Sequence, residues 1–176
     1  MNAQQIAQNG LVGVLFLSVL LLGSASGSAG SPDPPTTADR NLSKILVEIS
    51  LSLEHKKDVE AIKREFAAVG ISKVRHKVFT VGHPPRNIAI GRNVSAPIAR
   101  LVIRLAQTYN DGVSLLLPEE RLASNYIAIG SSIFDELFQY PITQDDLTRL
   151  VDPNLTTDQF HTLYRQLANI EQRPYR

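Results

Sequence analysis

The chain has 176 residues, of which 43% are hydrophobic and 20% are charged, and it contains no cysteine. This length accommodates one compact domain with additional segments, and the composition is typical of a globular core rather than a disordered chain. The absence of cysteine excludes disulfide bonds, thiolate zinc sites and a cysteine nucleophile. A net charge of +1 gives no indication of a polyanionic partner.

The N-terminal segment is uncharged. Positions 1–31 carry no charged side chain, and residues 11–23 (LVGVLFLSVLLLG) form a 13-residue apolar run that is followed by small residues. This pattern predicts an N-terminal hydrophobic helix over residues 1–30, either a cleaved signal peptide or a retained membrane anchor. The proline-rich residues that follow predict a semi-rigid linker over 31–43. We therefore expect the folded domain to be exported or membrane-anchored, outside the cytoplasm.

Residues 44–130 show the periodicities of strands and helices. The apolar residues of 44–53 alternate with period two, which predicts a strand, whereas 58–69 presents one apolar helical face and is followed by Gly70. The same patterns predict a helix from Ser95 to Tyr109 and further strands over 74–81, 87–91, 113–117 and 126–130. This βαββαβ order, with one strand added, predicts an α+β domain of the ferredoxin-like class: an antiparallel sheet with two helices on one face.

The tetrapeptide IAIG occurs twice, at 88–91 and 127–130. Each copy precedes a predicted helix start, where free backbone amides can hold an anion, and Arg92 would add a positive charge to the first copy. A single glycine per turn is neither GxGxxG nor a P-loop, so ordinary strand ends are the simpler interpretation. We therefore predict no nucleotide cofactor.

Residues 131–176 are predicted to form a helical tail. The segments 142–151 (ITQDDLTRLV) and 155–164 (LTTDQFHTLY) share one pattern, in which Thr143 and Thr156 are expected to cap a helix. Ser131 or Ser132 is expected to open a further short helix. Such a tail either packs its apolar faces on the preceding domain, the favoured interpretation, or docks on a partner.

The middle of the chain is basic, since seven basic residues and no acidic one lie between Phe66 and Asn110. Strand periodicity places alternate residues on the same face of a sheet, which would group the basic residues of 73–77. We expect this cationic face to contact an anionic ligand or partner through Lys73, Arg75, Lys77, Arg86, Arg92, Arg100 and Arg104. The ten acidic residues of 111–176 offer internal neutralisation as the alternative.

Few aromatic residues are interleaved with these cations, which argues against nucleic acid as the partner. An anionic cell-wall or lipid surface, or an envelope protein, fits an exported cationic face. The histidines lack the spacing of metal ligands, so no metal site is predicted. No GxSxG motif is present, which argues against a serine hydrolase. Carboxylates such as Glu119 or Asp135, together with His83, leave a small envelope hydrolase or transferase as an alternative.

The membrane-directed segment, the proline-rich spacer and the βαββαβ order over 44–130 together resemble bacterial envelope modules of the SPOR type. The C-terminal domain of LytR-type cell-wall ligases has a similar layout. The resemblance implies a non-catalytic envelope domain that binds cell-wall glycan or a partner protein. The sequence therefore predicts a membrane-tethered or exported binding module, with the enzyme above, or a structural subunit that docks through its C-terminal helices, as alternatives.

Overall fold

The computed structural model describes residues 42–132 and 141–169, which belong to a compact unit spanning Pro35–Arg176. The predicted signal peptide or anchor, nearly all of the linker and the short helix expected after Ser132 lie outside the described residues. Among the helices in the described ranges, none is long and apolar enough to cross a membrane.

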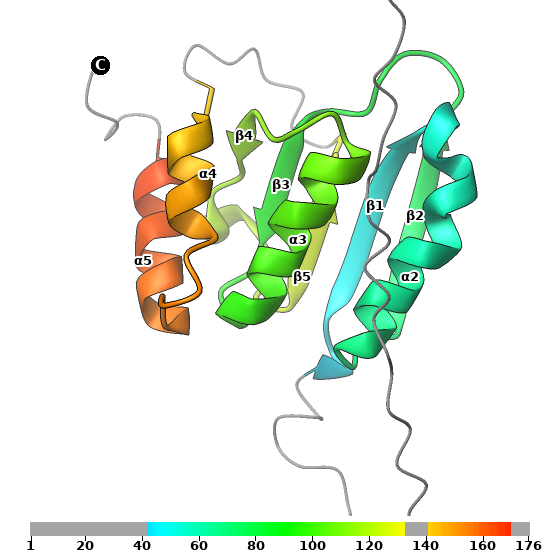
Figure 1. The fold of residues 1–176 in the computed structure, drawn as a ribbon. Coiled ribbons are helices and arrows are strands. Elements are labelled where there is room, and N and C mark those ends of the chain that lie inside the picture. The colour runs from blue at the N-terminus through cyan, green and yellow to red at the C-terminus, as the bar shows by residue number, and fades with distance from the viewer. Residues whose placement is uncertain (1–41, 133–140, 170–176) are drawn as a thin grey trace, which may run out of the picture. The chain divides into compact units, whose positions relative to one another are not determined.

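The described residues form a five-stranded sheet with four α-helices, which confirms the α+β class (Figure 1). The strands are β1 (Leu46–Ser52), β2 (Lys73–Phe79), β3 (Asn87–Ile90), β4 (Leu115–Leu116) and β5 (Tyr126–Ile129). The α-helices are α2 (Val59–Ala68), α3 (Ala96–Tyr109), α4 (Gln144–Leu150) and α5 (Thr157–Ala168). Two short 3₁₀ segments, η1 (Leu53–Asp58) and η2 (Glu119–Arg121), precede α2 and β5.

The strand order is β2-β1-β5-β3-β4, and it differs from the predicted antiparallel ferredoxin-like sheet. Strand β1 pairs in parallel with both β2 and β5, and β3 pairs in parallel with β4. Only β3 and β5 form an antiparallel pair within the described sheet. Each helical crossover therefore joins adjacent parallel strands, whereas the ferredoxin-like layout places another strand between the two strands that a crossover joins.

The predicted strand order was wrong because period-two patterning identifies the two faces of a strand but not the strands with which it pairs. In a ferredoxin-like sheet, residues 80–86 would join neighbouring strands. Instead, this link carries the chain from edge strand β2 past β1 and β5 to β3. Three strand spacings amount to about 14 Å, and seven extended residues reach about 23 Å, so the longer crossing is sterically easy.

One face of the sheet carries the main core. Residues Val47, Ile49 and Leu51 of β1 point to this face and are at most 3% exposed, together with Phe66 of α2 and Val102 of α3. Figure 1 shows α2 and α3 lying over this side of the sheet, with α5 beside α3 towards β4. The opposite face, here called the open face, receives the alternate residues of each strand.

The C-terminal helices share this core. Phe160 and Tyr164 of α5 are fully buried in it, and the Tyr164 hydroxyl donates to the Leu117 carbonyl oxygen at 2.9 Å. Both predicted caps are confirmed: Thr143 Oγ1 accepts from Asp146 N at 3.2 Å, and Thr156 Oγ1 accepts from Gln159 N at 3.3 Å. The expectation that the tail packs on the preceding domain is therefore confirmed for α4 and α5.

The two IAIG copies pair with each other. Ile88, Ala89 and Ile90 lie opposite Ile129, Ala128 and Ile127 in the antiparallel β3–β5 ladder. The ladder is extended symmetrically at both ends, since Gly91 N donates to Tyr126 O and Gly130 N donates to Asn87 O, each at 2.8 Å. The repeat thus builds the antiparallel junction between the two parallel parts of the sheet.

Candidate functional site

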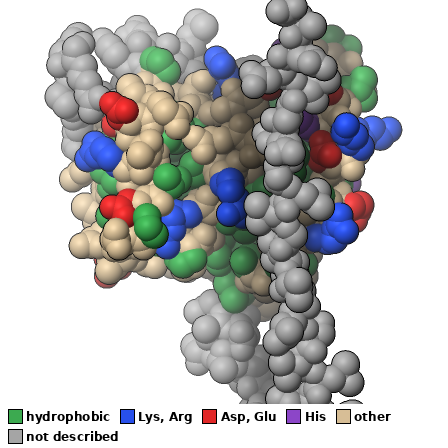
Figure 2. Space-filling view, in the orientation of Figure 1, with side chains coloured by type: hydrophobic (Ala, Val, Ile, Leu, Met, Phe, Trp, Pro, Cys, Tyr) green, Lys and Arg blue, Asp and Glu red, His purple; other side chains and the backbone are tan. Residues whose placement is uncertain are grey.

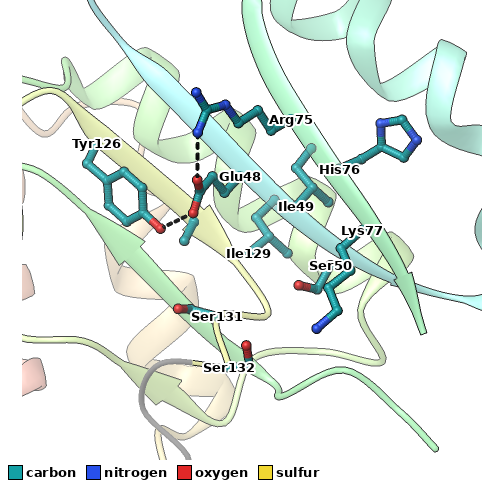
Figure 3. Close-up of a pocket in the computed structure, with 11 residues that line it drawn as sticks. Glu48, Ile49, Ser50, Arg75, His76, Lys77, Tyr126, Ile129, Ser131 and Ser132 are labelled. Atoms are coloured by element: carbon teal, nitrogen blue, oxygen red, sulfur yellow. Dashed lines mark hydrogen bonds and ion pairs between the residues drawn. The ribbon is translucent and has the colours of Figure 1, made fainter. Parts of the chain in front are cut away.

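A pocket of about 290 Å³ lies on the open face of β1, β2 and β5 (Figure 3). The parallel pairing of β1 with β2 places Glu48 beside Arg75 and Ser50 beside Lys77. Strand β5 adds Tyr126 on the other side of β1, and the turn after β5 adds Ser131 and Ser132. Because alternate strand residues share a face, these side chains from three strands converge on one hollow.

Glu48 is held between an aromatic hydroxyl and a guanidinium group. The Tyr126 hydroxyl donates to Glu48 Oε2 at 2.7 Å, and Arg75 Nη1 lies 3.7 Å from Glu48 Oε1. Partial burial, and secondarily the hydrogen bond to Glu48, raises the pKa of Tyr126 well above its ordinary value of 10. Tyr126 therefore remains a hydrogen-bond donor at neutral pH.

Lys77 supplies the second cation. Its ammonium group lies 4.7 Å from the centroid of the Phe79 ring, and within the described residues it forms no ion pair with a carboxylate. In Figure 3 the Lys77 side chain extends beside Ser50, whereas His76 points away towards the helix-covered side. Lys77 is therefore the least compensated charge lining the pocket.

The turn that carries the two serines is fixed by a buried asparagine. Asn87 is 0% exposed, accepts from Ser131 N at 2.7 Å through Oδ1, and donates from Nδ2 to Ser131 O at 2.9 Å. Gly130 precedes this turn with φ at +72°, a conformation that glycine adopts without strain. The position of Ser131 and Ser132 beside the pocket is thus set by the backbone.

The pocket has the groups required to hold a small anion. Arg75 and Lys77 provide two positive charges against the one carboxylate of Glu48, and serine and tyrosine hydroxyls supply neutral hydrogen-bonding groups. Glu48 is already engaged by Tyr126 and Arg75, so it acts as a fixed acceptor rather than an available base. The arrangement is suited to binding rather than to proton transfer.

The structure distributes the seven predicted contact residues over different surfaces. Arg75 and Lys77 line the pocket, and Lys73 lies on the same face of β2. Arg86 and Arg92 lie in the segments that flank β3, and Arg100 and Arg104 lie on α3. Figure 2 shows that Lys and Arg side chains on the helix-covered side are scattered among acidic and neutral ones.

The two arginines of α3 have structural partners. Arg100 Nη1 donates to the carbonyl oxygens of Asp152 at 3.1 Å and Leu155 at 3.4 Å, which ties α3 to the α4–α5 connection. Arg104 Nη2 donates to Glu65 Oε2 of α2 at 3.1 Å. Both side chains lie on the helical layer, away from the open face. The basic stretch is therefore continuous in sequence but not on the surface.

The amides of the turn after Gly91 are used within the protein. Gly91 N donates to Tyr126 O, Asn93 N donates to Ser124 O at 2.9 Å, and Ala96 N donates to Thr157 Oγ1 at 3.2 Å. Arg92 Nε donates to Ser124 Oγ at 2.8 Å. These contacts occupy several of the donors that an anion would need, and they tie the turn to the 123–126 segment and to α5.

A buried charged cluster was missed by the sequence analysis. The Nδ1 atom of His161 on α5 contacts Glu119 Oε1 in η2, and its Nε2 atom lies 2.7 Å from the Val94 carbonyl oxygen. Arg165 Nη1 lies 3.6 Å from the other carboxylate oxygen of Glu119. Each ring nitrogen of His161 therefore has a buried oxygen partner within the domain. The available signal was the position of His161, three residues before Tyr164 on the apolar face of α5.

Among the described residues of the hydrolase alternative, Glu119 and His83 have different partners. Glu119 is enclosed by His161, whereas His83 is 76% exposed and lies 3.4 Å from Asp111. Asp135 is outside the described residues. In the part of the chain that the structure describes, no group of three or more His, Cys, Asp or Glu side chains could hold a metal ion.

No protein-family model, curated protein or solved structure matches the chain.

Proposed function

We propose that the protein is a non-catalytic binding module, exported or tethered to a membrane, that holds an anionic group of a cell-envelope ligand in the open-face pocket. The pocket itself carries the proposal. Arg75, Lys77 and the hydroxyl groups of β1, β5 and the following turn converge there, although they are far apart in the sequence.

The volume of the pocket limits what it can accept. About 290 Å³ is at the lower end of the range for ligand pockets. This space suits a phosphate or carboxylate group with a few neighbouring atoms, such as one unit of a longer polymer or a lipid head group. Arginine and lysine are the usual partners of such anions, and hydroxyl groups complete their hydrogen bonds.

The N-terminal sequence supports a location at the envelope. The apolar run of residues 11–23 is typical of a signal peptide or anchor and would direct the domain to an exported or membrane-tethered position. Phosphate-bearing polymers and anionic lipid head groups are the anions of that environment. We therefore assign the ligand to the class of phosphate-bearing envelope polymers or lipids.

Calorimetric titration of the full-length chain with glycerol phosphate tests the proposal, because this compound represents one unit of both ligand sources. We expect binding that weakens at least about fivefold in Lys77→Gln, since a charge-assisted contact contributes about 1.5–3 kcal/mol. Arg104→Gln removes a cation from the helical layer and is the matched control, with unchanged affinity expected. Equal affinity in Lys77→Gln, or the absence of binding, would contradict the proposal.

A further inference from the structure

Strand β2 forms one edge of the sheet, and among the described strands it pairs only with β1. Its seven residues pair with β1 without interruption, from Lys73 opposite Leu46 to Phe79 opposite Ser52. An edge strand presents one row of backbone amide and carbonyl groups that can template the addition of another strand. The opposite edge, β4, has only two residues and offers a much shorter template.

The two faces of β2 differ in chemistry. Lys73, Arg75 and Lys77 are exposed on the open face, whereas Val74 and Val78 are half-buried on the other face. Val74 packs against the main core of the domain. A strand added beside β2 would therefore find three alternating cations on one face, and Val74, the exposed His76 and Val78 on the other.

Lysine and arginine on an edge strand commonly guard against unwanted pairing. Charged residues that prevent pairing usually occur on short or bulged edge strands, but β2 is long and keeps a continuous register with β1. The cations also discriminate between occupants. A second copy of β2 would place positive charges opposite positive charges, which is destabilising across a strand pair. An acidic strand would place carboxylates opposite the same residues.

We propose that the β2 edge binds an extended, acidic segment of a partner protein by strand addition. Alternate Asp or Glu residues of the partner lie beside Lys73, Arg75 and Lys77, and its intervening apolar residues lie beside Val74 and Val78. Within the described residues, Lys73 and Lys77 form no ion pair, so their charges are available for this contact. The contact uses the backbone edge of β2, which does not line the proposed anion pocket, but it shares the Arg75 and Lys77 side chains with that pocket.

The probe is the peptide acetyl-EVETEVE-amide, titrated into the ¹⁵N-labelled full-length chain. We expect amide shifts concentrated in residues 73–79 and slowed hydrogen exchange along β2. The matched probe is the same peptide with N-methyl groups on alternate residues, which keeps the charges but blocks one backbone edge. Loss of two or three backbone hydrogen bonds should weaken binding at least about fivefold.

Protein variants complete the test. Lys73→Glu is expected to abolish peptide binding, whereas Arg64→Glu makes the same charge change on an exposed position of α2 and should leave binding within about twofold. Equal binding of the methylated peptide would show that only charge attraction acts and would overturn strand addition. No binding at millimolar peptide, or pairing of the chain with itself through β2, would also overturn the proposal.

Discussion

Replacement of His161 by Gln should destabilise the domain by breaking the buried cluster between α5, η2 and the β3–α3 connection. The side chains of His161 and Glu119 are 6% and 5% exposed, so bulk water does not take the place of a partner that is removed. Leaving a buried hydrogen-bonding group without its partner costs about 1–3 kcal/mol, and more where that group is charged. The Arg165 guanidinium, half exposed and 3.6 Å away, compensates Glu119 only in part, so we expect about 3 kcal/mol.

Urea denaturation followed by circular dichroism measures this loss, and a thermal scan should show a decrease in Tm on the order of 10 °C. His83→Gln is the matched control, because His83 and its neighbour Asp111 are largely exposed, and it should change stability by less than about 0.5 kcal/mol. The double variant His161→Gln with Glu119→Gln changes both members of the contact, so its cost should be at least about 1 kcal/mol below the sum of the single costs. A cost below about 1 kcal/mol for His161→Gln, or strictly additive costs, would refute the reasoning.

Three further predictions concern local structure. A Cβ at position 91 would lie 2.5 Å from the Ala123 carbonyl oxygen, so Gly91→Ala should lower the free energy of unfolding by about 1–3 kcal/mol or more in chemical denaturation. An alanine at Gly82 would meet no atom within 4 Å, so only the backbone strain at φ +74° acts, and the loss should be about 1–2 kcal/mol. Thr156→Ala removes the cap of α5 and should cost about 1 kcal/mol, measured the same way. The pKa of Tyr126 is raised in the folded state, so its hydroxyl contributes stability below about pH 10 that is lost as the pH rises through the folded pKa. The free energies of unfolding of the wild type and Tyr126→Phe should therefore converge at alkaline pH.

Local patterns in the sequence predicted the elements well, because they depend on neighbouring residues. The periodicities located the strands and helices, Gly70 ends α2 with φ at +84° as expected, and the paired threonines cap α4 and α5. Strand periodicity also placed Arg75 and Lys77 on one face of β2, which the structure shows.

Long-range pairing could not be predicted in the same way. Glu48 and Tyr126 join the pocket only because β1 pairs in parallel with both β2 and β5, and a single sequence does not encode that register in any local pattern. For the same reason Arg100 and Arg104 were grouped with the strand cations, although α3 packs them on the other side of the sheet.

The proposed anion site lies on the open face rather than on the helical layer. A ¹⁵N backbone NMR titration of the full-length chain with glycerol phosphate tests it most directly, since it reports every amide at once. We expect shifts concentrated at Ser50, Lys77, Tyr126 and Ser132, which surround the pocket. Shifts concentrated instead around Arg100 and Arg104, or none at millimolar ligand, would contradict it.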